Sequence, residues 1–313
     1  MGRPQSRQSR GRPIDGWIIL DKPQGITSAH AVARIKRILD AAKVGHGGTL
    51  DPLATGLLPI ALGAATKTVP YIMDGTKLYR FTLKFGEARD SDDADGAVVA
   101  TSDVRPDDAA IRAALSAFRG LIMQVPPAFS AIKVNGERAY DLARQGAPPS
   151  LAARPAQIDR FELVERVDAD HAVFEVASGK GVYMRALARD LAQALGAVGH
   201  IAVLRRLAVG PFTIERAVTL DKLAEMGQEA GADPNFVLSV TTALADIPAL
   251  ALTSREIADL KQGLALSLVT LMGRIPEAAN PDDGLVRLMA EESCVALGRM
   301  AEGLLRTERF LQP

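Results

Sequence analysis

The order in which strand-like and helix-like patterns occur along this chain constrains its fold most strongly. Apolar and polar residues alternate most clearly from Leu78 to Phe85, where Tyr79, Phe81, Leu83 and Phe85 share one face of a predicted strand. Further strands are predicted over 17–20, 161–164 and 172–176, and helices over 28–39, 106–121 and 183–195. Because strands outnumber helices and do not alternate with them, the pattern favours an α+β fold over a doubly wound sheet.

Length and composition divide the chain into unequal parts. With 313 residues, about two domains are expected. Residues 1–13 are rich in Arg, Ser, Gln and Gly and predict a disordered basic tail. We expect the main domain over 14–245 and a small β-rich module over 246–313, with a helix near 254–263. The main domain contains a proline-rich excursion at about 122–155, and segments this long are usually functional.

The charge distribution indicates one face suited to a polyanion. Basic and acidic residues balance at 37 each, but the first 50 residues carry nine Lys and Arg against three Asp and Glu. No charge-free apolar run reaches the ~18 residues that a membrane span requires. The single cysteine, Cys294, excludes a disulfide framework. We therefore expect a cytoplasmic protein with no membrane contact.

Several familiar sites are incomplete in this sequence. A phosphate-loop-like segment at 63–68 lacks the glycine before Lys67. A calcium-loop-like segment begins at Ser91, but Ser102 occupies the position that requires a glutamate. The histidines lack zinc-ligand spacing, and no serine lies in a nucleophile elbow. The sequence accordingly predicts neither a metal nor a cofactor.

The strongest local signal is the glycine-rich segment from Gly45 to Gly56, which contains one acid, Asp51. Pro52 restricts Asp51 to an extended conformation, and the glycines allow a ligand to approach the backbone closely. Farther along, Tyr183 and Arg185 lie where a strand gives way to a helix, so Arg185 is placed to pair with a buried carboxylate such as Asp51. On pattern alone, an ordinary tight turn and an ordinary surface arginine remain open.

Seven motifs, in order across residues 16–222, resemble the bacterial tRNA pseudouridine-55 synthase (TruB) family. They are Asp21-Lys22-Pro23-x-Gly25-x-Thr27-Ser28, Gly45-His46-x-Gly48-Thr49-Leu50-Asp51-Pro52-x-Ala54-x-Gly56, Lys77-x-Tyr79-x-Phe81, Pro126-Pro127-x-x-Ser130-Ala131-x-Lys133, Arg144-Gln145-Gly146, Lys180-Gly181-x-Tyr183-x-Arg185 and Leu204-Arg205-Arg206-Leu207-x-Val209-Gly210. Residues 248–313 are loosely similar to the RNA-binding PUA module. The resemblance implies a mixed, largely antiparallel central sheet flanked by helices, followed by that PUA-like module.

The resemblance also implies a reaction. The family isomerises uridine-55 in the T loop of tRNA, breaking the C1′–N1 bond and forming C1′–C5 after the base is flipped out. Asp51 corresponds to the essential carboxylate, which acts as a nucleophile on the sugar or the base or assists deprotonation at C2′. A carboxylate close to the sugar suits the positive charge that develops as the glycosidic bond breaks.

By the same resemblance, further residues are assigned to the site. Arg185 pairs with Asp51, Tyr79 stacks on the target base and handles a proton, and His46 takes the vacated place in the stack. Leu207 lines the pocket, and Lys22 lies close to the cleft. The other expected substrate or RNA contacts are Gly48, Lys133 and Tyr183, together with a basic helix that carries Arg34 and Arg37. One departure is Phe129, where the family often has tyrosine.

Three alternatives remain open from the sequence. The chain could be a guide-RNA-dependent relative, a tRNA-folding chaperone whose catalysis is dispensable, or a metal-dependent nuclease that uses Asp90, Asp92, Asp93 and Asp95. Near-neutral charge and the lack of a long basic C-terminal extension favour a stand-alone enzyme. We expect a monomer that binds the T arm of tRNA without a guide RNA.

Overall fold

A computed structural model describes residues 11–134, 136–147, 149–233, 235–281 and 283–311. Its main feature is a nine-stranded sheet, in which β3 and β12 pair in parallel and the other described pairs are antiparallel. Along the sheet the order is β1 (Gly16–Lys22), β3 (Thr55–Leu62), β12 (Gly199–Val209), β4 (Lys77–Phe85), β11 (His171–Ser178), β10 (Arg154–Arg166) and β7 (Gly120–Gln124), with β2 (Val44–His46) beside β3 and β13 (Phe212–Thr213) beside β12. The predicted mixed, largely antiparallel sheet is confirmed.

Two helices form as the sequence predicts. In α1 (Ser28–Leu39), the Thr27 side chain accepts a hydrogen bond from the His30 amide and caps the helix, while Ile35 and Leu39 are buried. In α5 (Met184–Ala194), the apolar spacing buries one side of the helix against β12 and β4. The start of α5 fixes Arg185, and the start of α1 lies beside the loop that carries Asp51, so both helices position the site.

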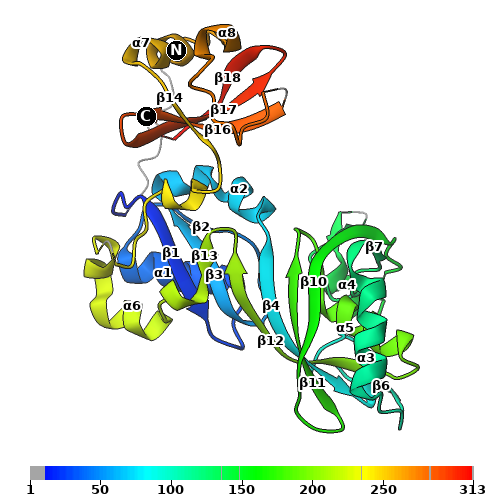
Figure 1. Cartoon of the computed structure of the whole chain (residues 1–313). Coiled ribbons are helices and arrows are strands. Elements are labelled where there is room, and N and C mark those ends of the chain that lie inside the picture. Colours follow the sequence, from blue (N-terminus) through cyan, green and yellow to red (C-terminus); the bar gives the residue numbers. More distant parts are fainter. Residues whose placement is uncertain (1–10, 135, 148, 234, 282, 312–313) are drawn as a thin grey trace.

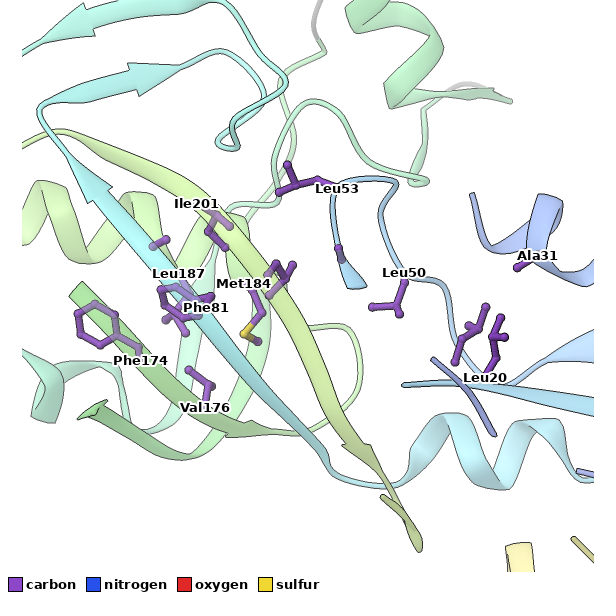
Figure 2. Close-up of a cluster of buried hydrophobic side chains, with 14 of the residues drawn as sticks. Leu20, Ala31, Leu50, Leu53, Phe81, Phe174, Val176, Met184, Leu187 and Ile201 are labelled. Atoms are coloured by element: carbon purple, nitrogen blue, oxygen red, sulfur yellow. The ribbon is translucent and has the colours of Figure 1, made fainter. Parts of the chain in front are cut away.

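A continuous core joins the elements that carry the site residues. Figure 2 shows Leu50 and Leu53, on either side of Asp51, in the same buried cluster as Met184, the neighbour of Arg185. Phe81 stacks on Phe174 within this cluster, with ring centroids 5.3 Å apart. The backbone on each side of the Asp51–Arg185 pair is therefore anchored by buried apolar side chains.

The C-terminal residues form a second sheet, seen beyond α2 (Val69–Asp74) in Figure 1. Its order is β14 (Ala249–Ala251), β16 (Asp283–Ala290), β17 (Ser293–Ala301), β18 (Leu304–Phe310) and β15 (Leu266–Ser267), with α7 (Ser254–Lys261) and α8 (Leu268–Leu271) packed beside it. Lys67, at the end of a 3-10 helix, donates to the carbonyls of Phe310 and Leu311, and Tyr71 of α2 donates to Glu308, so these hydrogen bonds join the module to the segment that follows β3.

The remaining elements are short. They are β5 (Glu87–Arg89), β6 (Val98–Thr101), α3 (Asp108–Ala114), β8 (Lys133–Val134), β9 (Glu137–Arg138), α4 (Ala139–Arg144) and α6 (Leu220–Met226), with 3-10 helices at 63–67, 115–118, 214–216, 227–231 and 242–244. No described helix is long and apolar enough to cross a membrane.

The predicted helix over 106–121 is wrong at its C-terminal end. The α-helix stops at Ala114, a 3-10 helix continues to Phe118, and β7 begins at Gly120. Gly120 has a φ of +80°, a conformation that a helix cannot continue through, and residues 120–124 pair with β10. Strand pairing across the sheet overrides the helical spacing here.

Other predicted boundaries also shift. The expected disorder of residues 1–10 lies outside the described residues, whereas Arg12 is held against Asp40 by a backbone hydrogen bond and donates to the Gln228 carbonyl. Both ends of the 122–155 excursion lie in the sheet, in β7 and β10. The glycine-rich segment is flanked by β2 and β3, so its irregular part is confined to residues 47–54.

A buried histidine predicts a pH dependence of stability. His200, on β12, is 1% exposed; its Nδ1 lies 2.8 Å from the Glu87 carbonyl, and burial lowers its pKa below 6.5. As the pH falls, His200 therefore takes up a proton in the unfolded chain before it does so in the folded one. The stability that the neutral buried side chain contributes is present above pH 6.5 and is lost below it. Between about pH 7.5 and about pH 5.5, the unfolding free energy of a His200→Gln variant should fall less than that of the wild type, by up to about 1.4 kcal/mol per pH unit. Parallel urea titrations that gave equal losses would contradict this.

Candidate active site

Asp51 and Arg185 meet at the centre of the site. Nε of Arg185 lies 2.9 Å from Oδ2 of Asp51; the Arg185 side chain is 5% exposed and the Asp51 side chain 35%. The Nε–H direction does not satisfy hydrogen-bond geometry, so the contact is an ion pair. Asp51 is thus paired on one side and open on the other. The pairing suggested by the sequence is present in the structure.

The rest of the Arg185 guanidinium is also engaged. It donates to the carbonyls of Ser91, at 3.0 Å, and Phe129, at 2.9 Å. A second carboxylate, Asp93, lies 3.5 Å from the same guanidinium, and its side chain is 7% exposed. Arg185 therefore joins three loops around Asp51 and has little freedom to turn away.

A cavity of about 1120 Å³ opens in front of this pair. Four of the predicted site residues line it: His46, Asp51, Lys133 and Arg185. The lining is charged: Asp90, Asp93 and Asp95 come from one segment of the chain, and Lys133 and Arg144 from another. The Arg144 guanidinium lies 5.0 Å from the ring centroid of Tyr140, which also lines the cavity.

The other predicted site residues are not among those that line this cavity. Tyr79 is half-buried on β4, paired with Arg206 in register, and Leu207 lies at an irregularity of β12 next to that pair. Tyr183 is half-buried, and burial raises its pKa. His46, by contrast, lines the cavity, and its pKa is lowered first by burial and then by the charge of Arg206. Stacking by Tyr79 and a pocket-lining role for Leu207 remain predictions.

Lys22 requires the clearest revision. It is 0% exposed and donates to the carbonyls of Pro23, Ile26 and Pro52, at 2.9, 2.9 and 3.4 Å. Burial lowers its pKa to about 8, while the charge of Asp51 acts in the opposite direction. A side chain held in this way is not available to RNA, so we assign Lys22 to positioning the residue after Asp51.

Ser28 is a site residue whose role the sequence did not reveal. Its buried hydroxyl accepts from the amide of Leu50 at 2.8 Å and donates to the carbonyl of Leu50 at 3.1 Å. The Gly25 amide donates to the Pro52 carbonyl at 2.8 Å. The residues on both sides of Asp51 are therefore tied to the start of α1. The Thr27-Ser28 motif was the available signal, but only helix capping could be read from it.

Removing the Ser28 hydroxyl should affect both stability and rate. In Ser28→Ala, the buried amide of Leu50 loses its acceptor, which should cost about 1–3 kcal/mol of unfolding free energy. The resemblance assigns Asp51 to catalysis, and small displacements of a catalytic group can cost up to about 100-fold in rate; on that role we expect a slower catalytic step with unchanged tRNA affinity. Single-turnover rates and filter binding measure the two effects. A Ser28→Thr variant, which keeps the hydroxyl, should lie nearer the wild type, and wild-type stability in Ser28→Ala would contradict the bridge.

Two acids of the nuclease alternative already have basic partners. Asp93 faces Arg185, and Asp92 lies 2.8 Å from Arg189. In the described part of the chain, no group of three His, Cys, Asp or Glu residues is arranged to hold a metal ion. These carboxylates are therefore placed to orient arginines, and the pairing of Asp93 with Arg185 was not predicted because the two residues lie far apart in the sequence.

Comparison with known proteins identifies the family of this chain. The model of the TruB family pseudouridylate synthase N-terminal domain matches residues 36–184, and that of the tRNA pseudouridylate synthase B C-terminal domain matches 185–245. A protein of Gluconacetobacter diazotrophicus named tRNA pseudouridine synthase B is 64% identical over 97% of this chain and 100% of its own length. The chain belongs to the TruB family. The boundary between the two family models falls at the start of α5, and one sheet includes strands from both regions, because β12 pairs with β3 and β4.

More distant relatives share the family architecture. A Rhodospirillum rubrum protein of the same name is 51% identical over 98% of this chain and 99% of its own length. A solved Cbf5-Nop10-Gar1 complex contains a chain with 27% identity and a TM-score of 0.73, covering 100% of this chain and 92% of that chain. A chain in an H/ACA RNP bound to a substrate RNA containing 2′-deoxyuridine has 25% identity and the same TM-score, covering 99% and 92%. The pseudouridine-synthase fold expected from the sequence is confirmed.

Proposed function

We propose that this protein is a stand-alone tRNA pseudouridine synthase that converts uridine-55 of the T loop to pseudouridine. The observation that carries this proposal is the Asp51–Arg185 pair at the back of a large cavity in a TruB-family chain. The isomerisation cleaves the C1′–N1 bond, reattaches the base through C5 and releases the C5 hydrogen as a proton, while N1 takes up a proton. The reaction is redox-neutral and consumes no water.

The geometry suits a carboxylate that acts on a flipped nucleotide. Arg185 orients one oxygen of Asp51, while the exposed side of the carboxylate faces the cavity. There the carboxylate can stabilise or trap the electron-deficient sugar as the glycosidic bond breaks, or act on the base or at C2′. A base still stacked in its loop does not present these atoms, so base flipping is part of the proposal.

The charged walls of the cavity suggest how the T arm is oriented. Lys133 and Arg144 form the wall that can accept phosphates, whereas Asp90 and Asp95 form a wall that would repel them. We place the RNA backbone along the first wall and the flipped nucleotide towards Asp51, with His46 at the rim in the vacated stacking position. The exposed Arg37 and half-buried Arg34 of α1 remain candidates for further phosphate contacts.

Recognition through RNA pairing is not part of this proposal. The solved relatives described as H/ACA or Cbf5 assemblies contain further components, whereas the bacterial relatives match this chain over nearly their whole length. We propose that a monomer recognises the T arm by shape and phosphate contacts, with no guide RNA, metal or cofactor.

Position mapping tests this proposal. Unmodified tRNA transcript is incubated with the protein and EDTA, treated with carbodiimide and mapped by primer extension. We expect one new stop, diagnostic of pseudouridine-55, and the same product in an isolated T-arm stem-loop. A stop elsewhere, or activity only after a guide RNA is added, would overturn the assignment. Refolding of a misfolded tRNA by Asp51→Asn protein would add a chaperone role independent of catalysis.

A further inference from the structure

The loop that carries Asp51 is hydrogen-bonded to a buried arginine, Arg206, that has no role in the function proposed above. Arg206, on β12, is 1% exposed. Its guanidinium donates to the carbonyls of Leu57 at 2.7 Å, Gly48 at 3.1 Å and Thr49 at 3.4 Å. Within the described residues its hydrogen-bond partners are thus carbonyl oxygens rather than carboxylates. A buried guanidinium without a counter-ion is costly, which indicates a role beyond packing.

The backbone is shaped to bring Arg206 under this loop. Gly56 has a φ of +97°, and a Cβ at this position would lie 2.3 Å from the Arg206 carbonyl oxygen. Gly48, with a φ of +119°, turns its carbonyl towards the guanidinium. Both glycines are therefore required for the close approach of β3 and the loop to Arg206. This accounts for two glycines of the motif around Asp51.

The charge of Arg206 reaches three other titratable groups around the loop. It contributes, after burial, to the lowered pKa values of His46 and Lys77, and it also lowers the pKa of Lys22, where burial dominates and Asp51 opposes it. His46, Lys77 and Lys22 come from β2, β4 and β1, so the charge of Arg206 acts on three strands around the loop that carries Asp51.

We propose that Arg206 is a positioning residue for the isomerisation: by holding the Gly48 and Thr49 carbonyls it fixes the direction of Asp51, and its charge, which no carboxylate of the described residues pairs with, adds positive potential beneath the loop. This inference rests on the proposed function for its effect on rate. The neighbouring Arg205 provides the contrast, since it forms a two-point ion pair with Asp21, at 3.0 and 2.7 Å, and its side chain is 36% exposed.

The test compares Arg206→Lys, Arg206→Met and the matched control Arg205→Met with the wild type. Lysine keeps the charge but cannot reproduce the guanidinium fork, so the single-turnover rate of Arg206→Lys should fall about 100-fold while the Kd for tRNA changes by less than about threefold. Arg205→Met should react within about threefold of the wild type. A folded Arg206→Lys protein with a wild-type rate, or an equal loss in Arg205→Met, would overturn the positioning role.

A second readout does not depend on catalysis. NMR titration of His46 should give a higher pKa in Arg206→Met than in the wild type, and the wild-type value in Arg206→Lys, because only the first variant removes the charge. An unchanged His46 titration in Arg206→Met would overturn the electrostatic part. If Arg206→Met does not fold, the Arg206→Lys rate decides the proposal. An inactive wild type would refute the proposed function. The His46 titration would still decide whether the charge of Arg206 acts on the groups around the loop.

Discussion

Asp51→Asn protein is expected to bind tRNA with a wild-type Kd and to lose its activity by a factor of roughly 10⁴ or more. The asparagine side chain has nearly the same shape as aspartate, so the loop held by Ser28 and Arg206 should keep its conformation. What it lacks is the anionic oxygen that faces the cavity. Single-turnover rates with saturating enzyme separate this loss from any change in binding.

The control for this prediction is Asp221→Asn. Asp221 is an exposed aspartate in the first turn of α6, outside the cavity, so its variant should react within about threefold of the wild type. A slow Asp221→Asn enzyme would indicate a general effect of charge on tRNA binding. Substantial activity in Asp51→Asn would remove the carboxylate from the mechanism altogether.

Arg185→Met should lose both activity and stability. The substitution leaves Asp93, whose side chain is 7% exposed, without its cation, and releases the carbonyls of Ser91 and Phe129. Removing one partner of a buried ion pair costs about 3–5 kcal/mol, and the 35% exposure of Asp51 places the expected loss near the lower value. With Asp51 no longer oriented, the rate should fall at least about 100-fold.

A second substitution separates the two effects. Adding Asp93→Asn to Arg185→Met removes the unpaired buried charge, so about 1 kcal/mol or more of unfolding free energy should return while the rate stays low. Arg189→Met, one turn along α5, removes a more exposed arginine and should destabilise the protein less. Urea unfolding of these variants, of the Asp93→Asn single variant and of the wild type measures these differences. Additive losses in the double variant would contradict the proposed network.

The parts of the site that the sequence reveals are those within continuous motifs. Asp51 and Arg185 each lie in a short continuous motif that indicates their chemistry, and the ion pair predicted between them is present. The β4 strand could be predicted because one of its faces is buried, which produces a strict alternation of apolar and polar residues. In each case the signal lies in neighbouring residues of the sequence.

The parts that the sequence did not reveal depend on contacts between distant segments. Asp93 belongs to the site only because α5 brings Arg185 beside it, and Ser28 only because the loop of Asp51 crosses the start of α1. From the sequence, Lys22 was predicted to contact RNA; the structure shows instead that its ammonium group donates to three backbone carbonyls. The end of the helix at Ala114 was missed because pairing of β7 with β10 outweighs helical spacing.

Tritium release from tRNA labelled with [5-³H]uridine tests the central claim most directly. Joining C1′ to C5 must expel the C5 hydrogen, so one tritium should leave per tRNA when the wild type acts without guide RNA and with EDTA present. A transcript with cytidine at position 55 should release none. No release from the uridine-55 transcript, or equal release from both transcripts, would contradict the assignment of this site to uridine-55 isomerisation.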